Sequence, residues 1–198
     1  MASSSRPRDP DRAVTDSRML TTAEYFAGQT TLLPQELIWG VVRAAPSPHP
    51  RHQRALFRLA QLLGEHVRDG GLGEVFVSPF DVVLDRERAL VVQPDICVYA
   101  YDRVELVTDR AWAPPDLAVE ILSPRLRIGD LEERLVWFAT YGVRECWLVH
   151  LLEASVEVLA FFHGETVQRR RFGGSDRIES VVLPDFAHAF ADFVSAEG

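Results

Sequence analysis

The sequence predicts a mixed α/β fold (α+β in its details), in which a central mixed β-sheet is flanked by helices. The first observation is a pair of segments, about 50–68 and 130–141, whose apolar residues follow the spacing of a helix face. The second is a series of short apolar runs of strand length between and after these segments. A helix, three strands, a helix and further strands in that order favour a mixed sheet with helices on its faces.

The predicted elements are marked by residues that begin or interrupt them. Thr21 and Asp130 are typical helix N-caps, and Gly142 is a typical helix end. Pro79 and Pro94 interrupt two of the predicted strands and indicate a bulge or an edge position. Strands are expected at 36–42 (broken by a glycine turn), 74–84, 90–99, 116–122, 146–151 and 156–162, and 167–172 and 178–183 are expected to extend the sheet.

The 198 residues suffice for one domain, which we expect at 19–198 after a disordered, polar tail at 1–18. The net charge of −8 excludes a wholly basic nucleic-acid coat protein but leaves a local basic patch open. All 21 basic residues are arginines, which excludes every mechanism that needs a lysine amine. Cys97 and Cys146 lie in apolar runs and indicate buried thiols, so with no signal peptide or membrane span we expect a cytoplasmic protein.

Two carboxylates stand out because they interrupt strands that are otherwise apolar. Asp95 lies in the 90–99 run and Glu120 in the 116–122 run, although acidic residues are rarely buried without a partner. Two like charges about 4 Å apart repel by roughly 4 kcal/mol at an effective dielectric near 20, so such a pair takes up a proton or holds a cation. Oxygen ligands suit Mg²⁺ or Mn²⁺, and a cation of this kind supports phosphodiester hydrolysis.

Simpler interpretations of these residues remain open. Asp95 follows Pro94 and could face solvent at a sheet edge, and Glu120 could pair with an arginine across the sheet. Asp130 and Arg134 are four residues apart on one helix face, so either Asp130 holds Arg134 or the arginine points at the carboxylates.

The chain also resembles a known family over about residues 20–193. The resemblance lies chiefly in three stretches, Gln93-Pro94-Asp95-Ile96, Val119-Glu120-Ile121-Leu122-Ser123-Pro124 and Gly142-Val143-Arg144-Glu145-Cys146-Trp147. In these the sequence is similar to the Uma-two family of bacterial proteins, which have the restriction-endonuclease-like PD-(D/E)XK fold. The resemblance implies this fold, with extra N-terminal and C-terminal strands, and a metal-dependent DNA endonuclease.

Residue roles follow from the same resemblance. Asp95 and Glu120 are expected to bind Mg²⁺ or Mn²⁺, and Arg134 stands at the helix position of the family's lysine. An arginine can stabilise charge on a phosphate but cannot act as a base. The alternative function is therefore a nucleic-acid-binding or dimeric interaction protein of the same fold that has lost turnover.

Further candidates are weaker. Glu36 could supply a third carboxylate, and His52 could approach phosphate or metal, or simply satisfy a helix end. Arg51, Arg54 and Arg58 share a helix face that either contacts the DNA backbone or is only solvated. Arg169, Arg170 and Arg171 offer the same two alternatives. We expect DNA as the partner, a homodimer and no association with membranes.

Overall fold

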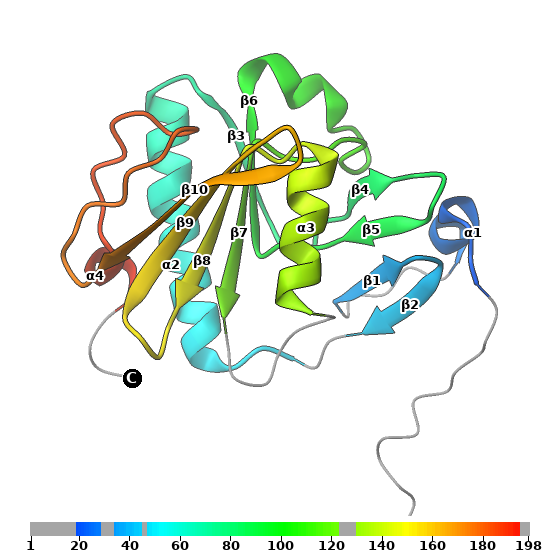
Figure 1. Ribbon diagram of the computed structural model, residues 1–198, viewed down its shortest axis with the longest axis horizontal. Coiled ribbons are helices and arrows are strands. Elements are labelled where there is room, and N and C mark those ends of the chain that lie inside the picture. Colours follow the sequence, from blue (N-terminus) through cyan, green and yellow to red (C-terminus); the bar gives the residue numbers. More distant parts are fainter. Residues whose placement is uncertain (1–18, 29–33, 45–46, 123–129, 195–198) are drawn as a thin grey trace, which may run out of the picture.

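The computed structural model describes residues 19–28, 34–44, 47–122 and 130–194. The tail predicted at 1–18 and the turn predicted at 124–129 lie outside these residues. Two sheets form the framework (Figure 1). The larger has the strand order β10-β9-β8-β7-β6-β3, with bounds β3 Gly73–Val77, β6 Ile96–Ala100, β7 Leu117–Leu122, β8 Glu145–His150, β9 Ser155–Phe162 and β10 Glu165–Gly173.

The smaller sheet lies beside the larger one and contains both N-terminal strands. Its order is β2-β1-β5-β4, with bounds β1 Gln35–Ile38, β2 Val41–Ala44, β4 Val82–Asp85 and β5 Leu90–Val92. Strands β7 and β8 are parallel and the other pairs are antiparallel, so the predicted mixed sheet is confirmed. The helices are α1 Thr22–Ala27, α2 Pro50–Asp69, α3 Leu131–Tyr141 and α4 Phe190–Phe193, with a 3-10 helix η1 at Tyr101–Leu106.

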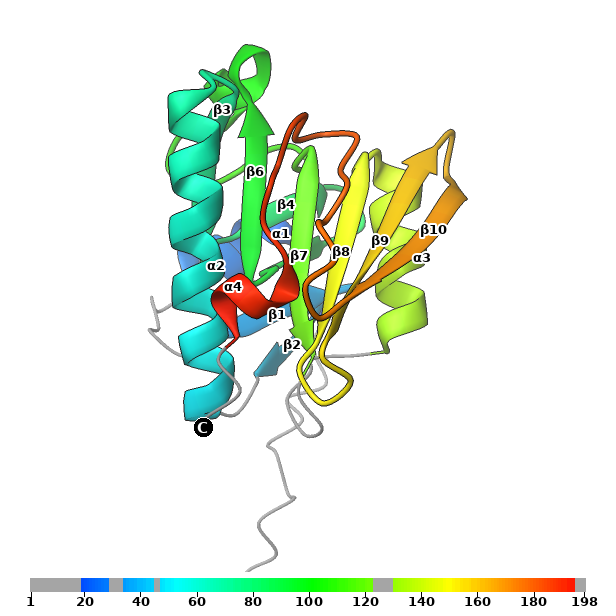
Figure 2. The ribbon, with the colours of Figure 1, turned by 90° about the vertical axis from the view of Figure 1, so that its left-hand side faces the viewer.

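The two long helices cover opposite faces of the larger sheet (Figure 2). Alternate residues of β7 divide between these faces: Val119 packs in the core under α2, and Ala118 packs in the core that includes α3. This alternation follows from the two-residue period of a strand. It assigns Glu120, which follows Val119, to the face covered by α3.

Pro79 and Pro94 divide the predicted strands instead of only producing a bulge or an edge position. The predicted strand 74–84 is two strands, β3 and β4, which belong to different sheets and are separated by the segment containing Pro79. The predicted strand 90–99 is likewise divided at Pro94 into β5 and β6. Since proline cannot donate a ladder hydrogen bond, each proline marks the point where the chain passes from one sheet to the other.

The predicted helix caps are confirmed, whereas the strand predicted at 178–183 is not. Thr21 caps α1 in a reciprocal capping box with Glu24, and Asp130 caps α3 by accepting from the backbone N–H groups of the second and third helical residues. The strand predicted at 178–183 is wrong: Ile178 and Leu183 are buried, but the segment pairs with no strand of the sheet. Its apolar residues pack on the core under α2. The apolar pattern of this segment therefore reflects burial and not strand pairing.

The two cysteines are buried, as expected, and form no disulfide among the described residues. Among the described residues, no helix is both long and apolar enough to cross a membrane.

Glu145, at the start of β8, binds the segment at Ser180 and Val181 and so connects it to the larger sheet. It is fully buried and accepts hydrogen bonds from Trp147 Nε1 (2.6 Å), Ser180 Oγ (2.5 Å) and the Val181 backbone N–H (2.6 Å). Removing the acceptor leaves the buried Trp147 N–H and two part-buried donors, of Ser180 and Val181, unsatisfied, at about 1–3 kcal/mol for a buried group. We expect Glu145→Ala to lower the free energy of unfolding by at least about 3 kcal/mol in urea titrations. Glu165→Ala, on an exposed glutamate of β10, should change it little, and equal effects would contradict this role.

Candidate active site

The register of β6 and β7 brings the two strand carboxylates together. Ile96 lies opposite Val119 and Cys97 opposite Ala118, so continuing the register by one position places Asp95 opposite Glu120. The two residues are 25 positions apart in the chain. Asp95 directly precedes β6 rather than lying within a strand as predicted, and its side chain is only 17% exposed, which argues against a solvent-facing residue.

Asp95 is held by the backbone of β7 and by α2. Its Oδ2 atom accepts a hydrogen bond from the Ile121 backbone N–H at 2.7 Å and lies 3.2 Å from His52 Nε2. His52 is in the first turn of α2, which approaches this end of the sheet. The histidine contacts a carboxylate rather than a free helix end, and the carboxylate is fixed in position by two elements.

Glu120 is held by an arginine from α3 that also binds the smaller sheet. Arg134 Nε donates to Glu120 Oε1 at 2.6 Å, while its NH1 and NH2 groups donate to Glu36 Oε2 and Oε1 at 2.9 and 2.7 Å. The side chain of Arg134 is 3% exposed, so this bidentate pair is shielded from water. The predicted arginine partner of Glu120 exists, but it comes from a helix rather than from across the sheet. Asp130 caps the start of α3 and does not bind Arg134, which donates to Glu120 and Glu36 instead.

Gln93 binds Glu36 and also contacts Asp81, and the sequence analysis assigned neither Gln93 nor Asp81 to the site. The Gln93 backbone N–H donates to Glu36 Oε1 at 2.7 Å, and Gln93 Nε2 donates to Asp81 Oδ1 at 2.9 Å. Gln93 stands two positions before Asp95, inside a stretch that carried the family resemblance, and this was the available signal. Its interaction with Glu36 depends on β1 and β5 being neighbours, which local sequence does not show.

The site holds more negative than positive charge. Arg134 pairs with Glu36 and Glu120, and His52 lies beside Asp95, so three carboxylates face two basic groups. Burial raises the pKa of Glu120; Arg134 lowers it, but the charges of Asp95 and Glu36 add to burial and bring it to about 7. Burial works against the charged form of Arg134, yet Glu120 and Glu36 raise its pKa well above the usual value. The arginine therefore stays charged, and the remaining negative charge falls on the carboxylates.

His52 responds to the same field. Burial lowers its pKa, but the hydrogen bond and charge of Asp95, together with the charge of Glu120, raise it overall. Its Nδ1 atom is buried and has no hydrogen-bond partner among the described residues. The protonated imidazole is thus favoured beside Asp95.

The donor set suits a hard divalent cation bound by few protein ligands. Among the described residues, Asp95 Oδ1 and Glu120 Oε2 make no hydrogen bond, although the other oxygen of each carboxylate does. The described residues contain no group of three or more His, Cys, Asp or Glu side chains that could hold a metal. A pair of carboxylates is nevertheless what Mg²⁺ uses when waters and substrate phosphates complete its shell. The excess negative charge and the two oxygens fit such an ion.

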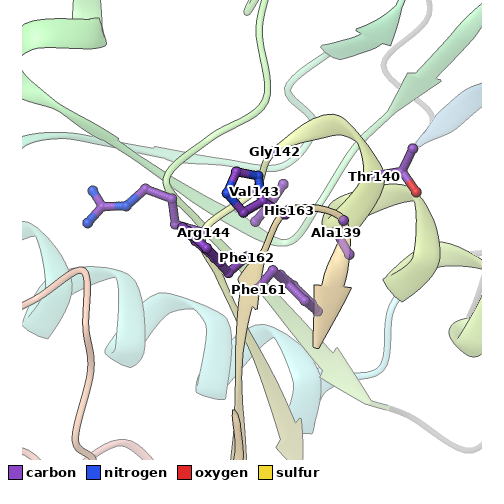
Figure 3. A pocket seen from close by; sticks show the side chains of 9 residues that line it. Ala139, Thr140, Gly142, Val143, Arg144, Phe161, Phe162 and His163 are labelled. Carbon is purple, nitrogen blue, oxygen red and sulfur yellow. The ribbon is translucent and has the colours of Figure 1, made fainter. Parts of the chain in front are cut away.

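A separate hollow of about 560 Å³ lies at the other end of α3 (Figure 3). It is lined by the last turn of that helix, by Arg144 and by the β9–β10 hairpin with Phe162 and His163, and no carboxylate faces it. Arg134 is in the first turn of the same helix, so this hollow is distinct from the carboxylate pair.

Comparisons with known proteins agree with this architecture. The family model Uma2, described as “Putative restriction endonuclease”, matches residues 23–191. A crystal structure of a protein from Anabaena variabilis, described as a “putative nuclease”, superposes with a TM-score of 0.73 at 19% identity, covering 89% of this chain and 98% of that one. At this identity the likeness shows the fold. No curated protein matches.

The raised pKa of Glu120 predicts how stability depends on pH. Between the usual 4.5 and about 7, the folded protein retains a proton that the unfolded chain has released, so stability falls as pH rises through this window. Glu120→Gln keeps an acceptor for Arg134 and removes the titration. One pKa unit corresponds to about 1.4 kcal/mol, so we expect the variant to gain about 2 kcal/mol on the parent between pH 5 and 8.

This gain is measured as the difference in urea midpoints between parent and variant at each pH. Glu133→Gln, on an exposed glutamate of α3 next to Arg134, is the matched control and should leave the pH dependence unchanged. A Glu120→Gln curve parallel to that of the parent would show that Glu120 ionises normally.

Proposed function

The chain belongs to the Uma2 family, described as “Putative restriction endonuclease”, and on this premise we propose that it is a Mg²⁺- or Mn²⁺-dependent endonuclease that hydrolyses phosphodiester bonds of DNA. One observation carries the proposal. Asp95, directly before β6, and Glu120 of β7 lie near each other, each with one oxygen free of hydrogen bonds among the described residues, in a site whose negative charge exceeds its positive charge. The match to the family and the similarity of the fold to a putative nuclease do not depend on this proposed metal site.

In this proposal Asp95 and Glu120 hold the cation, and the other residues hold the carboxylates. When bound, the cation would stabilise negative charge on the phosphate and make an attacking water more acidic. Ile121 and His52 orient Asp95, while Arg134 orients Glu120 and supplies a permanent positive charge beside it. Glu36 fixes Arg134 from the smaller sheet.

Arg134 acts through Glu120, because its guanidinium is buried and three of its N–H groups are engaged by glutamates. It cannot accept a proton at any relevant pH. This observation also favours the second candidate function, a protein that binds nucleic acid without cutting it. The two candidates are separated by cleavage assays.

The first test is cleavage of supercoiled plasmid DNA with Mg²⁺ or Mn²⁺ and with EDTA. We expect the parent to nick or linearise the plasmid only with metal. Asp95→Asn and Glu120→Gln should each reduce the rate at least about a hundredfold, since a metal contributes several kcal/mol and each 1.4 kcal/mol is tenfold. Asp102→Asn, on an exposed carboxylate of η1, should retain the parent rate. Full activity in Asp95→Asn would refute the assignment.

The second test restores lysine. Arg134→Lys places a compact charge where a planar fork binds two glutamates, so the variant should unfold at lower urea concentration, at a cost of about 2 kcal/mol. We expect it to cleave DNA at least as fast as the parent. If neither protein cleaves DNA, while both bind it with an affinity that falls as salt rises, the binding function is supported instead.

A further inference from the structure

We propose that Gln93 is a positioning residue for both candidate metal ligands, although its own hydrogen bonds within the described part of the chain go to other residues. It acts on Asp95 through the two peptide bonds between them. It acts on Glu120 through Glu36 and Arg134, which are hydrogen-bonded in series. The proposal rests on the proposed function, because it takes Asp95 and Glu120 as ligands of a divalent cation. It adds the residue that holds these ligands in a fixed relative position.

The side-chain amide of Gln93 has one orientation that satisfies both of its partners. Its Nε2 group donates to Asp81 Oδ1 at 2.9 Å, and its Oε1 atom accepts from the Gln35 backbone N–H at 3.3 Å. An ionised carboxylate only accepts and a backbone N–H only donates, so the reversed amide loses both bonds. Gln35 begins β1 and Asp81 directly precedes β4, and these strands flank β5 on its two sides. The amide therefore ties the end of β5 to both of its neighbours.

The backbone of Gln93 carries this restraint to Glu120. Its N–H donates at 2.7 Å to Glu36 Oε1, the same atom that accepts from Arg134 NH2 at 2.7 Å. Arg134 Nε then donates to Glu120 Oε1 at 2.6 Å. Every bond of this series has at least one charged partner, and such bonds are the short and strong ones. Since Glu36 and Arg134 are buried, a shift of the Gln93 peptide either moves them or leaves a buried carboxylate without one of its donors.

The other ligand is restrained by the chain itself. Pro94 follows Gln93, has a fixed φ angle and restricts the residue before it to extended backbone. At the far end of this short segment, the Asp95 carbonyl oxygen accepts from the Ser78 backbone N–H, just after β3, at 3.0 Å. Residues 93–95 are thus held by the smaller sheet at one end and by the larger sheet at the other. The position of Gln93 therefore sets where Asp95 begins β6.

The relative position of the two ligands matters because each has one oxygen already engaged. Asp95 Oδ2 accepts from Ile121 and Glu120 Oε1 accepts from Arg134, so a cation relies on the second oxygen of each carboxylate. Mg²⁺ requires near-ideal octahedral geometry with oxygens at about 2.0–2.1 Å, so small shifts of either ligand are costly. Residues that orient metal ligands typically change metal affinity by about 10–100-fold when they are replaced.

The polarity of residue 93 matters as well as its size. Burial raises the pKa of Asp81 and the charge of Glu36 adds to this, whereas the hydrogen bond from Gln93 lowers it. A neutral amide thus gives Asp81 a donor without adding to the negative charge of the site. Exchanging the two groups, with a carboxylate at position 93 and an amide at position 81, conserves both hydrogen bonds and the total charge.

The test measures the affinity of the full chain for Mn²⁺ alone, without DNA, from the electron paramagnetic resonance signal of the free ion. Gln93→Met keeps the length of the side chain and removes both of its hydrogen bonds, while the backbone N–H that binds Glu36 remains. We expect the dissociation constant for Mn²⁺ to rise about tenfold. Gln168→Met, on an exposed glutamine of β10, is the matched control and should bind Mn²⁺ as the parent does.

The double variant Gln93→Glu, Asp81→Asn tests whether the two hydrogen bonds carry the effect. Its carboxylate can accept from the Gln35 N–H and from the new amide, so we expect it to bind Mn²⁺ with the parent affinity. Urea midpoints of the same variants report stability separately. A contact that serves stability alone lowers the midpoint and leaves the Mn²⁺ affinity of the folded protein unchanged.

Three outcomes would count against the proposal. Equal Mn²⁺ affinities of Gln93→Met and the parent would overturn the positioning role and leave the proposed function intact. A double variant that binds Mn²⁺ as weakly as Gln93→Met would overturn it too, because the hydrogen bonds would then not be what positions the ligands. A parent that does not bind Mn²⁺ would overturn both the proposed metal site and the role of Gln93.

Discussion

The structure depends on one buried guanidinium. Arg134, from α3, binds Glu36 of the smaller sheet and Glu120 of the larger sheet, and all three side chains are at most 10% exposed. Helix α3 lies between the two sheets (Figure 1), so all three elements meet at this guanidinium. Charges withdrawn from water are tolerated only when they are paired and hydrogen-bonded, which ties the relative position of the sheets to this contact.

The same contact creates the chemistry of the site. One guanidinium cannot neutralise Glu36, Glu120 and Asp95 together. Burial raises the pKa of Glu120, and the charges of Asp95 and Glu36 add to this and bring it to about 7 despite Arg134. The fold thus places an uncompensated negative charge where one oxygen of each strand carboxylate is free of hydrogen bonds among the described residues. A buried charge imbalance of this kind is costly for stability alone, and a cation would relieve it.

Local sequence was sufficient for most elements. Caps and spacing located α2 and α3, and the alternation of apolar residues located the strands. Pro79 and Pro94 were recognised as interruptions, but their effect, the passage of the chain between two sheets, is a property of strand pairing. The segment 178–183 failed for the same reason: buried apolar residues look like a strand whether or not a partner strand is available.

For the site, the sequence by itself determined which residues are anomalous: Asp95 and Glu120 interrupt apolar runs, and lysine is absent. The tertiary structure decided what these residues contact. It set Asp95 against His52, shared Arg134 between Glu120 and Glu36, and brought in Gln93 through the pairing of β1 with β5. The sequence shows which charged residues would be costly to bury. It does not show their partners, because a partner can lie far away in the chain: Glu36 and Arg134 are 98 positions apart.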